Sequence, residues 1–267
     1  MTTAVHPGTT VGELLRDWRR QRRLSQLQLS VDVGTSTRHL SFVETGRSKP
    51  SSEMILRLAD QLDVPLRERN RLLLAGGYAP VYPERSLDDP EMQSSLNAVR
   101  QVLAAHEPNP ALAVDHAWNV IEANNGLDVL LGGVPPSLLA GRVNALRLSL
   151  HPDGMARSIV NLGEWRGHVL GSLRRHLAVS SDPELRELYD ELLAYPCDQD
   201  VPPMDTPRGG GAHVPRQFRV GDRVLSFLGI ISTFGTALDV SLAELSIEAL
   251  LPADPDTAAY LHGGPRA

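Results

Sequence analysis

Apolar residues recur every three or four positions through the first 75 residues, which is the spacing of helices that bury one face. In the first such segment Leu14, Leu15 and Trp18 share a face, while the arginines around them fall mostly outside. The same pattern repeats four more times before residue 76. It predicts an all-α N-terminal domain of five short helices, at about 11–23, 26–33, 37–45, 53–62 and 66–75, with Ser52 capping the fourth.

The second and third of these helices are separated by a very short turn. Ser25 and Ser36 stand where the two helices would begin, and a serine hydroxyl there accepts a hydrogen bond from a free backbone N–H. Gly34 ends the second helix because glycine takes the left-handed conformation without steric cost. Two helices joined in this way form a helix-turn-helix, in which the first turn of the second helix reaches base edges in DNA.

Beyond residue 90 the pattern mixes two periodicities. Helical spacing predicts helices at about 91–106, 155–177 and 183–193, and short apolar or alternating runs predict strands at about 111–114, 118–123, 214–220 and 224–232. Trp118 and Val120 should share a face of their strand. The segment 242–251 fits a strand or a buried helix equally well. Helices mixed with antiparallel strands predict an α+β domain.

Pro80, Pro83 and Pro90 interrupt any helix between these halves. We therefore expect a helix-turn-helix domain over 1–79, a linker and the start of a connecting helix over 80–98, and a second domain over 99–267.

Charge separates the two halves as well. Residues 1–80 hold 12 Lys/Arg and 8 Asp/Glu, a balance of +4, whereas residues 81–267 hold 14 and 24, a balance of −10. The basic half is the one with the helix-turn-helix, as contact with phosphates requires.

The single Cys197 and the lack of an apolar run near 18 residues predict a cytoplasmic protein without disulfide, Cys-rich metal site or membrane span.

A specific combination of residues extends the helix-turn-helix pattern. It comprises Ser25-Gln26, Gly34-Thr35-Ser36, ArgHisLeuSer at 38–41, GluThrGlyArg at 44–47 and Pro50-Ser51. At this spacing the segment 10–75 resembles the lambda-repressor-like (XRE) DNA-binding family.

The resemblance implies double-stranded DNA as the partner. Gln26 would then bond a backbone phosphate, and Arg47 would reach the sugar-phosphate backbone. Ser36, Thr37, Arg38 and His39 would face the major groove or its flanking phosphates. Arg38 could bond a guanine through two N–H groups. The alternatives are a solvated helix face for Arg38 and His39, and a capping role for Gln26.

The second half also carries recognisable segments. They are AHEPNPALAVDHAWNV from Ala105, NALRLSLHPDG from Asn144, NLGEW from Asn161, FGTALDVSLAELSIE from Phe234 and LPADPDTAAYL from Leu251. Over 100–262 the chain resembles the MmyB-like ligand-binding domain, a PAS-like sheet with helices on one side. That resemblance implies a sensor for a small apolar or amphipathic ligand, with fatty acids as the associated class and no other cofactor.

Candidate ligand-binding residues follow from chemistry more than from pattern. Arg147 could bond a carboxylate with its planar guanidinium, and Asn144 and His151 lie on the same segment. Trp118 and Trp165 could form walls. The alternatives are that Asn144 and Arg147 satisfy backbone groups, that His151 belongs to a turn and that both tryptophans are core.

No catalytic motif was found, because HExxH, Walker A, GxSxG and paired CxxC patterns are all missing. Glu164 and His168 stand one helical turn apart, a spacing that is common on solvated helix faces, so we predict no metal site. The sequence predicts a DNA-binding transcriptional regulator, expected to be a homodimer because operators repeat as half-sites. The alternative is an antitoxin-like or scaffolding protein that acts through a protein partner.

Overall fold

The computed structural model describes residues 9–177, 182–201, 215–235 and 237–263. The chain forms two compact units. The first comprises residues 1–85 together with 236–243, and the second comprises 86–235 together with 244–267. The return of residues 236–243 to the first unit is a feature that no sequence pattern indicated.

Five helices build the first unit, as predicted: α1 (Val11–Gln21), α2 (Gln26–Asp32), α3 (Thr37–Glu44), α4 (Ser52–Gln61) and α5 (Leu66–Ala75). Ser51 caps α4, since its hydroxyl accepts the Met54 N–H at 3.2 Å; the prediction of Ser52 was wrong by one residue. The apolar stripes of the helices meet in one aliphatic core around Leu15, Leu40 and Leu58. The short helix α11 (Val240–Ala243) belongs to this unit.

Helix α1 lies unusually close to the end of α3 because of Gly12. A Cβ added at Gly12 would stand 2.2 Å from the Val43 carbonyl oxygen and 3.1 Å from Glu44 Cα. Only a residue without a side chain fits at this distance. The close approach holds the N-terminus of α1 against the C-terminus of α3.

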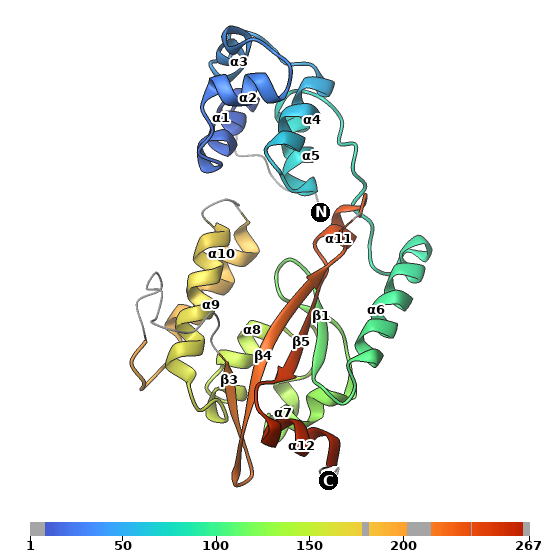
Figure 1. The fold of residues 1–267 in the computed structure, drawn as a ribbon, viewed down its shortest axis with the longest axis vertical. Helices are drawn as coiled ribbons and strands as arrows, with labels where there is room; N and C mark the ends of the chain where they lie inside the picture. Colours follow the sequence, from blue (N-terminus) through green and yellow to red (C-terminus); the bar gives the residue numbers. More distant parts are fainter. Residues whose placement is uncertain (1–8, 178–181, 202–214, 236, 264–267) are drawn as a thin grey trace. The chain divides into compact units, whose positions relative to one another are not determined.

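The second unit is α+β and contains a curled antiparallel sheet of five strands in the order β2-β1-β5-β4-β3 (Figure 1). The strands are β1 (Ala111–Val114), β2 (Val120–Ala123), β3 (Arg216–Val220), β4 (Arg223–Thr233) and β5 (Ser246–Pro252). The principal helices are α6 (Gln93–Ala105), α7 (Asp128–Leu131), α8 (Ala145–Leu150), α9 (Leu162–Leu177), α10 (Pro183–Ala194) and α12 (Pro255–Gly263). Short 3-10 turns complete it at Pro90–Met92, Asn125–Leu127, Pro136–Leu138 and Met155–Arg157. The predicted α+β, PAS-like fold class is confirmed, but the expectation of helices on one side of the sheet is wrong, because α6 covers the face opposite to α8, α9 and α10.

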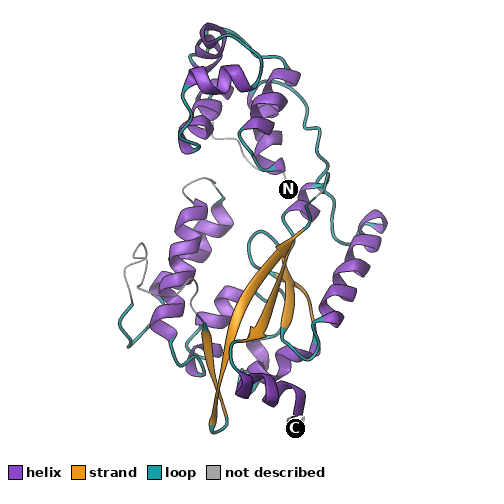
Figure 2. Cartoon of the chain, viewed as in Figure 1, coloured by secondary structure: helices purple, strands orange, loops and turns teal. Residues whose placement is uncertain are grey.

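The two faces of the sheet are covered differently, as the helices in Figure 2 indicate. On one face, α6 packs its apolar side on Ala111, Ala113, Ile247 and Ala249. On the other face, Phe218, Phe227 and Leu250 join the core formed by α8, α9 and α10. The register places Gly229 opposite Leu250 and Ile231 opposite Glu248, so these residues also belong to the second face.

Three expectations for this unit need correction. Helix α9 starts at Leu162 rather than 155, because residues 155–157 form a separate 3-10 turn and Ile159 pairs with Phe218 of β3 in an isolated bridge. Trp118 lies in the turn before β2 with φ of 67°, so it shares no strand face with Val120. The ambiguous segment 242–251 contains the start of β5, a strand.

Within the described residues, no helix is both long enough and apolar enough to cross a bilayer.

We predict that Gly12→Ala lowers the free energy of unfolding by roughly 1–3 kcal/mol, the usual cost of overpacking. The gain in helix propensity from alanine is smaller than this cost. Urea unfolding followed by circular dichroism measures the change. Gly132→Ala is the control, because a Cβ there meets nothing within 4 Å. Equal stability of the Gly12 variant and the wild type would show that α1 tolerates a side chain at this contact.

Candidate nucleic-acid interface and ligand cavity

Hydrogen bonds at the helix ends fix the turn between α2 and α3. The Ser25 hydroxyl accepts the Gln28 N–H at 3.1 Å, and the Ser36 hydroxyl accepts the His39 N–H at 3.1 Å. Gly34 has φ of 67°, which lets the chain leave α2 sharply. These caps set the direction in which the first turn of α3 leaves the helical core.

Arg38 and Arg47 gather on one aromatic ring. Both arginines are exposed, and their guanidinium carbons lie 5.3 Å and 5.9 Å from the Phe42 ring centroid. The Phe42 carbonyl also accepts the Arg47 N–H at 2.8 Å. Phe42 thus orders two cations on the outer side of α3. Sequence reasoning missed Phe42, although its position four residues after Arg38 on a helix was a usable signal.

Three of the other predicted DNA contacts make hydrogen bonds within the protein. The Ser36 hydroxyl caps α3, and the Thr37 hydroxyl makes a 2.9 Å hydrogen bond with the Ser30 hydroxyl of α2. His39 is half-buried. The Gln26 amide donates to a Glu44 carboxylate oxygen at 2.8 Å. Ser36, Thr37 and Gln26 therefore shape the turn in this structure, and their DNA contacts stay predictions.

A buried ion pair ties α3 to α1. Arg19 of α1 donates through Nε at 2.6 Å and Nη2 at 2.8 Å to the two carboxylate oxygens of Glu44. Its Nη1 donates to the Leu24 carbonyl in the turn before α2 at 2.8 Å. The Glu44 side chain is 1% exposed. One network thus joins α1, α2 and α3, and it was not predicted because the partners are 25 residues apart.

The network also controls ionisation. Burial acts to raise the pKa of Glu44, but the hydrogen bonds from Arg19 and Gln26 outweigh it, and the pKa lies below the ordinary 4.5. The hydrogen bond to Glu44 in turn raises the pKa of Arg19. Both groups are therefore charged at neutral pH.

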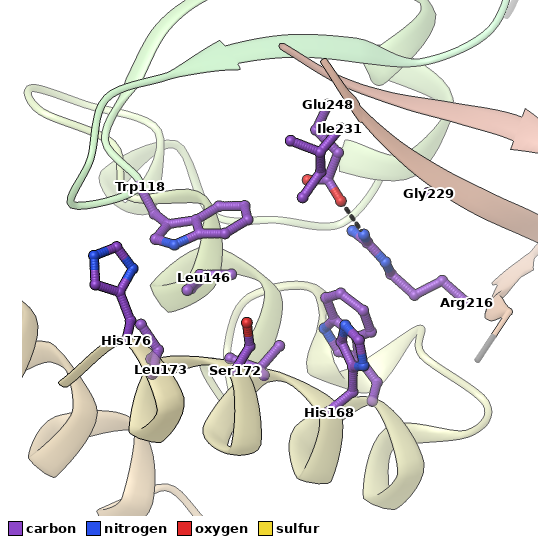
Figure 3. Close-up of a pocket in the computed structure, with 12 residues that line it drawn as sticks. Trp118, Leu146, His168, Ser172, Leu173, His176, Arg216, Gly229, Ile231 and Glu248 are labelled. Atoms are coloured by element: carbon purple, nitrogen blue, oxygen red, sulfur yellow. Dashed lines mark hydrogen bonds and ion pairs between the residues drawn. The ribbon is translucent and has the colours of Figure 1, made fainter. Parts of the chain in front are cut away.

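The second unit contains a cavity of about 250 Å³ between α9 and the second face of the sheet. Helix α9 contributes Trp165, His168, Val169, Ser172, Leu173 and His176. Arg216, Gly229, Ile231 and Glu248 come from β3, β4 and β5, and Trp118 and Leu146 complete the wall. Figure 3 shows Trp118 and His176 toward one end of the cavity and Arg216 and His168 toward the other. Apolar walls with a few polar groups are typical of small-molecule sites.

The polar end of the cavity is built around Arg216. Its Nη2 donates to a Glu248 carboxylate oxygen, and its guanidinium lies 3.7 Å from the Trp165 ring centroid. His168 stacks on Trp165 at 5.4 Å. Burial, and then the charge of Arg216, lower the pKa of His168 below its ordinary value, so this imidazole is neutral near pH 7.

Of the five residues predicted to bind ligand, only Trp118 and Trp165 line this cavity. Arg147 instead makes two hydrogen bonds of 2.8 Å to Glu191 of α10. Asn144 is buried, caps α8 and donates to the Ala117 carbonyl, and His151 packs edge-on against Tyr195. The geometry thus gives no support to Arg147 as the anion contact of this cavity.

Arg216, and not Arg147, is the arginine that lines the cavity. The sequence of its strand could have indicated this. The strand RQFRV alternates, so Arg216 must share a face with Phe218 if Phe218 is buried in the core. Among the described residues, no group of three His, Cys, Asp or Glu side chains is placed to hold a metal ion.

Comparison with known proteins covers both units. Residues 97–262 match the family model described as MmyB-like transcription regulator ligand binding domain, and residues 15–69 match a helix-turn-helix model.

Two relatives resemble part of the chain. It is 34% identical over 91 residues to the uncharacterized HTH-type transcriptional regulator RghRB of Bacillus subtilis (strain 168), an alignment that covers 34% of this chain and 63% of the relative. It is 32% identical over 59 residues to the ImmF control region 10 kDa protein of Bacillus phage phi105, covering 22% of this chain and 66% of the relative. The chain therefore spans slightly less than two thirds of the length of these relatives.

We predict that Glu44→Gln lowers the free energy of unfolding by about 3 kcal/mol, because Arg19 would remain buried without its anion. The pKa of Glu44 is depressed in the folded state, so the pair's stabilisation is present above the ordinary value of 4.5 and is lost as the pH falls through the folded-state pKa. The difference in the free energy of unfolding between the wild type and the variant should therefore become smaller as the pH falls below 4.5. Urea unfolding at pH 7 and at pH 3.5 measures it.

The control is Asp60→Asn, which breaks the Arg69–Asp60 pair in the same unit, where the aspartate side chain is 79% exposed. That change should cost less than about 1 kcal/mol. Equal effects of the two substitutions would contradict a dominant role for the buried pair.

Proposed function

The chain belongs to the MmyB-like transcription regulators, as its sequence indicated, and on this premise we propose that it is a sequence-specific DNA-binding regulator controlled by a small amphipathic ligand. The first unit would read an operator through α3, and the second would hold the ligand in the cavity beside α9. The observation that carries the proposal is the cluster of Arg38 and Arg47 on Phe42, outside a helix whose inner side is fixed by a buried ion pair.

Arg38 and Arg47 divide the work of DNA recognition in this proposal. Arg38 lies on the first turn of α3, where a guanidinium reaches the O6 and N7 acceptors of guanine in the major groove. Arg47 follows the helix and is suited to a phosphate. Phe42 holds both guanidiniums close to the ring and reduces the freedom that each would lose on binding.

Two copies of the chain would bind together, because operators of this class repeat as half-sites about one helical turn apart. The cavity favours this regulator over the antitoxin-like alternative, since a protein that acts only through a protein partner needs no pocket for a small molecule. A partner that co-purifies in equal amount would support that alternative.

The ligand cavity would suit a molecule with an apolar body and one polar group. The apolar walls are formed by Trp118, Leu146, Val169, Leu173 and Ile231. Arg216 and Glu248 offer the polar contacts. Acyl compounds, the class implied by the family resemblance, have this form.

The chain itself links the cavity to the DNA-binding unit. Strands β4 and β5, which carry Ile231 and Glu248, are joined by the segment 236–243, and this segment belongs to the first unit. There the Val240 N–H donates to the Pro83 carbonyl at 2.8 Å, and Asp239 pairs with Arg85 at 3.1 Å. A ligand that shifts β4 or β5 would thereby pull on the first unit, provided that its affinity differs between the two arrangements.

We predict that Arg38→Ala reduces operator affinity by about 10- to 100-fold and relaxes selectivity at one base pair, because one bidentate contact is worth roughly 1–3 kcal/mol. Arg47→Ala should weaken binding to all sequences alike and reduce the salt slope by about 1. Fluorescence anisotropy with the promoter region of its own gene, across a salt series, separates the two signatures.

Arg57→Ala is the matched control, since Arg57 is an exposed arginine on α4 of the same unit. It should change affinity and selectivity little. Tight binding that ignores sequence, or an Arg38 variant no weaker than the control, would remove the proposed recognition.

We predict that Asp239→Asn uncouples the units. Ligand binding and DNA binding should each keep their affinity, while the effect of one on the other, typically 5- to 150-fold in allosteric proteins, shrinks toward none. DNA affinity measured with and without a saturating ten-carbon acyl probe (decanamide or decanoate) reports it, with Asp60→Asn as control. Full coupling in the Asp239 variant would rule out this segment as the route.

A further inference from the structure

Resting on the ligand cavity proposed above, we infer that it selects a neutral polar group which both donates and accepts hydrogen bonds, such as a carboxamide, over a free carboxylate. The inference depends on the ion pair between Arg216 and Glu248, which lines the cavity and is itself nearly closed to bulk solvent. The side chains are 11% and 8% exposed.

The pair leaves hydrogen-bonding capacity of both kinds. In the part of the chain that the structure describes, one contact from Arg216 Nη2 to Glu248 Oε1 is the side-chain hydrogen bond that joins them. A guanidinium has five N–H donors, and a carboxylate has two oxygens. Arg216 therefore keeps donors for a ligand, and Glu248 keeps its Oε2 as an acceptor. A ligand group that only accepts hydrogen bonds leaves the Glu248 oxygen without a donor, and one that only donates leaves the Arg216 N–H groups without an acceptor.

Space beside the pair comes from Gly229 on β4. A Cβ at this position would stand 3.3 Å from Arg216 Nη2 and 3.4 Å from Glu248 Oε1. The glycine thus leaves open the side from which both charged groups can be approached at once. The Arg216 guanidinium also lies 3.7 Å from the Trp165 ring centroid, a contact that favours this placement of the arginine.

Charge then decides between ligands. Among the Lys, Arg, Asp and Glu residues, Arg216 and Glu248 line the cavity, and their opposite charges form an ion pair. His168 adds no positive charge near pH 7, because burial and Arg216 lower its pKa. A bound carboxylate would place a second anion beside Glu248 on one guanidinium, in surroundings that solvate charge poorly. A carboxamide donates to Glu248, accepts from Arg216 and adds no charge.

The test compares decanamide with decanoate, which share a chain length and differ in charge at pH 7.5. Titration calorimetry on the full chain gives both affinities, and quenching of Trp118 and Trp165 reports whether the cavity is occupied. The wild type should bind decanamide at least tenfold more tightly than decanoate.

Glu248→Gln should reverse this preference. The variant keeps the shape of the side chain and leaves Arg216 without an anion, so decanoate should gain at least tenfold while decanamide loses affinity. Glu191→Gln is the matched control, because it makes the same change in the Arg147–Glu191 pair, which does not line the cavity. Its preference should equal that of the wild type.

The wild-type comparison needs no variant and therefore holds even if Glu248→Gln fails to fold. Decanoate binding to the wild type as tightly as decanamide, or more tightly, would overturn the selection and leave the ligand cavity standing. An unchanged preference in folded Glu248→Gln would do the same. No binding of either probe to any variant would remove the cavity's ligand role, and the selection with it.

Discussion

The buried pair of Arg19 and Glu44 is the constraint on which the DNA-binding unit depends. Glu44 ends α3, Arg19 lies on α1, and Arg19 also bonds the turn before α2, so three helices meet at one carboxylate. A buried charge without its partner is costly, and the helices therefore pack in the arrangement that satisfies it. Gly12 permits this arrangement by letting α1 reach the backbone of α3. The outer side of α3, with Arg38 and Arg47 on Phe42, is the consequence.

The second unit uses a buried ion pair for a different purpose. Arg19 and Glu44 make two hydrogen bonds to each other, and further hydrogen bonds join them to Gln26 and to the Leu24 carbonyl. Arg216 and Glu248 make one hydrogen bond to each other, and they lie beside Gly229 in the wall of a cavity. The first pair therefore fixes a fold, whereas the second offers its remaining donors and acceptor to a ligand. The segment 236–243, which lies between β4 and β5 in the sequence, belongs to the first unit.

Local rules were enough to predict α2 and α3, because Ser25, Ser36 and Gly34 mark their ends by mechanisms that act over a few residues. The spacing of apolar residues predicted the other three helices of the first unit. The two family resemblances and the fold class are likewise confirmed. Contacts between distant residues escaped prediction. Helix α9 starts several residues after its predicted start because Ile159 pairs with Phe218 on β3. Arg147 donates hydrogen bonds to Glu191, which lies 44 residues away in the sequence. The alternation of β3 would have placed Arg216 on the cavity face of the sheet, but only if the burial of Phe218 had been known.

Selection of bound fragments from random-sequence DNA by the full chain, followed by sequencing, would show whether α3 reads a DNA sequence from this fixed position. We expect enrichment of one motif, repeated as half-sites with their centres about 10–10.5 base pairs apart or a multiple of that distance. A bound pool no different from the input would contradict this expectation.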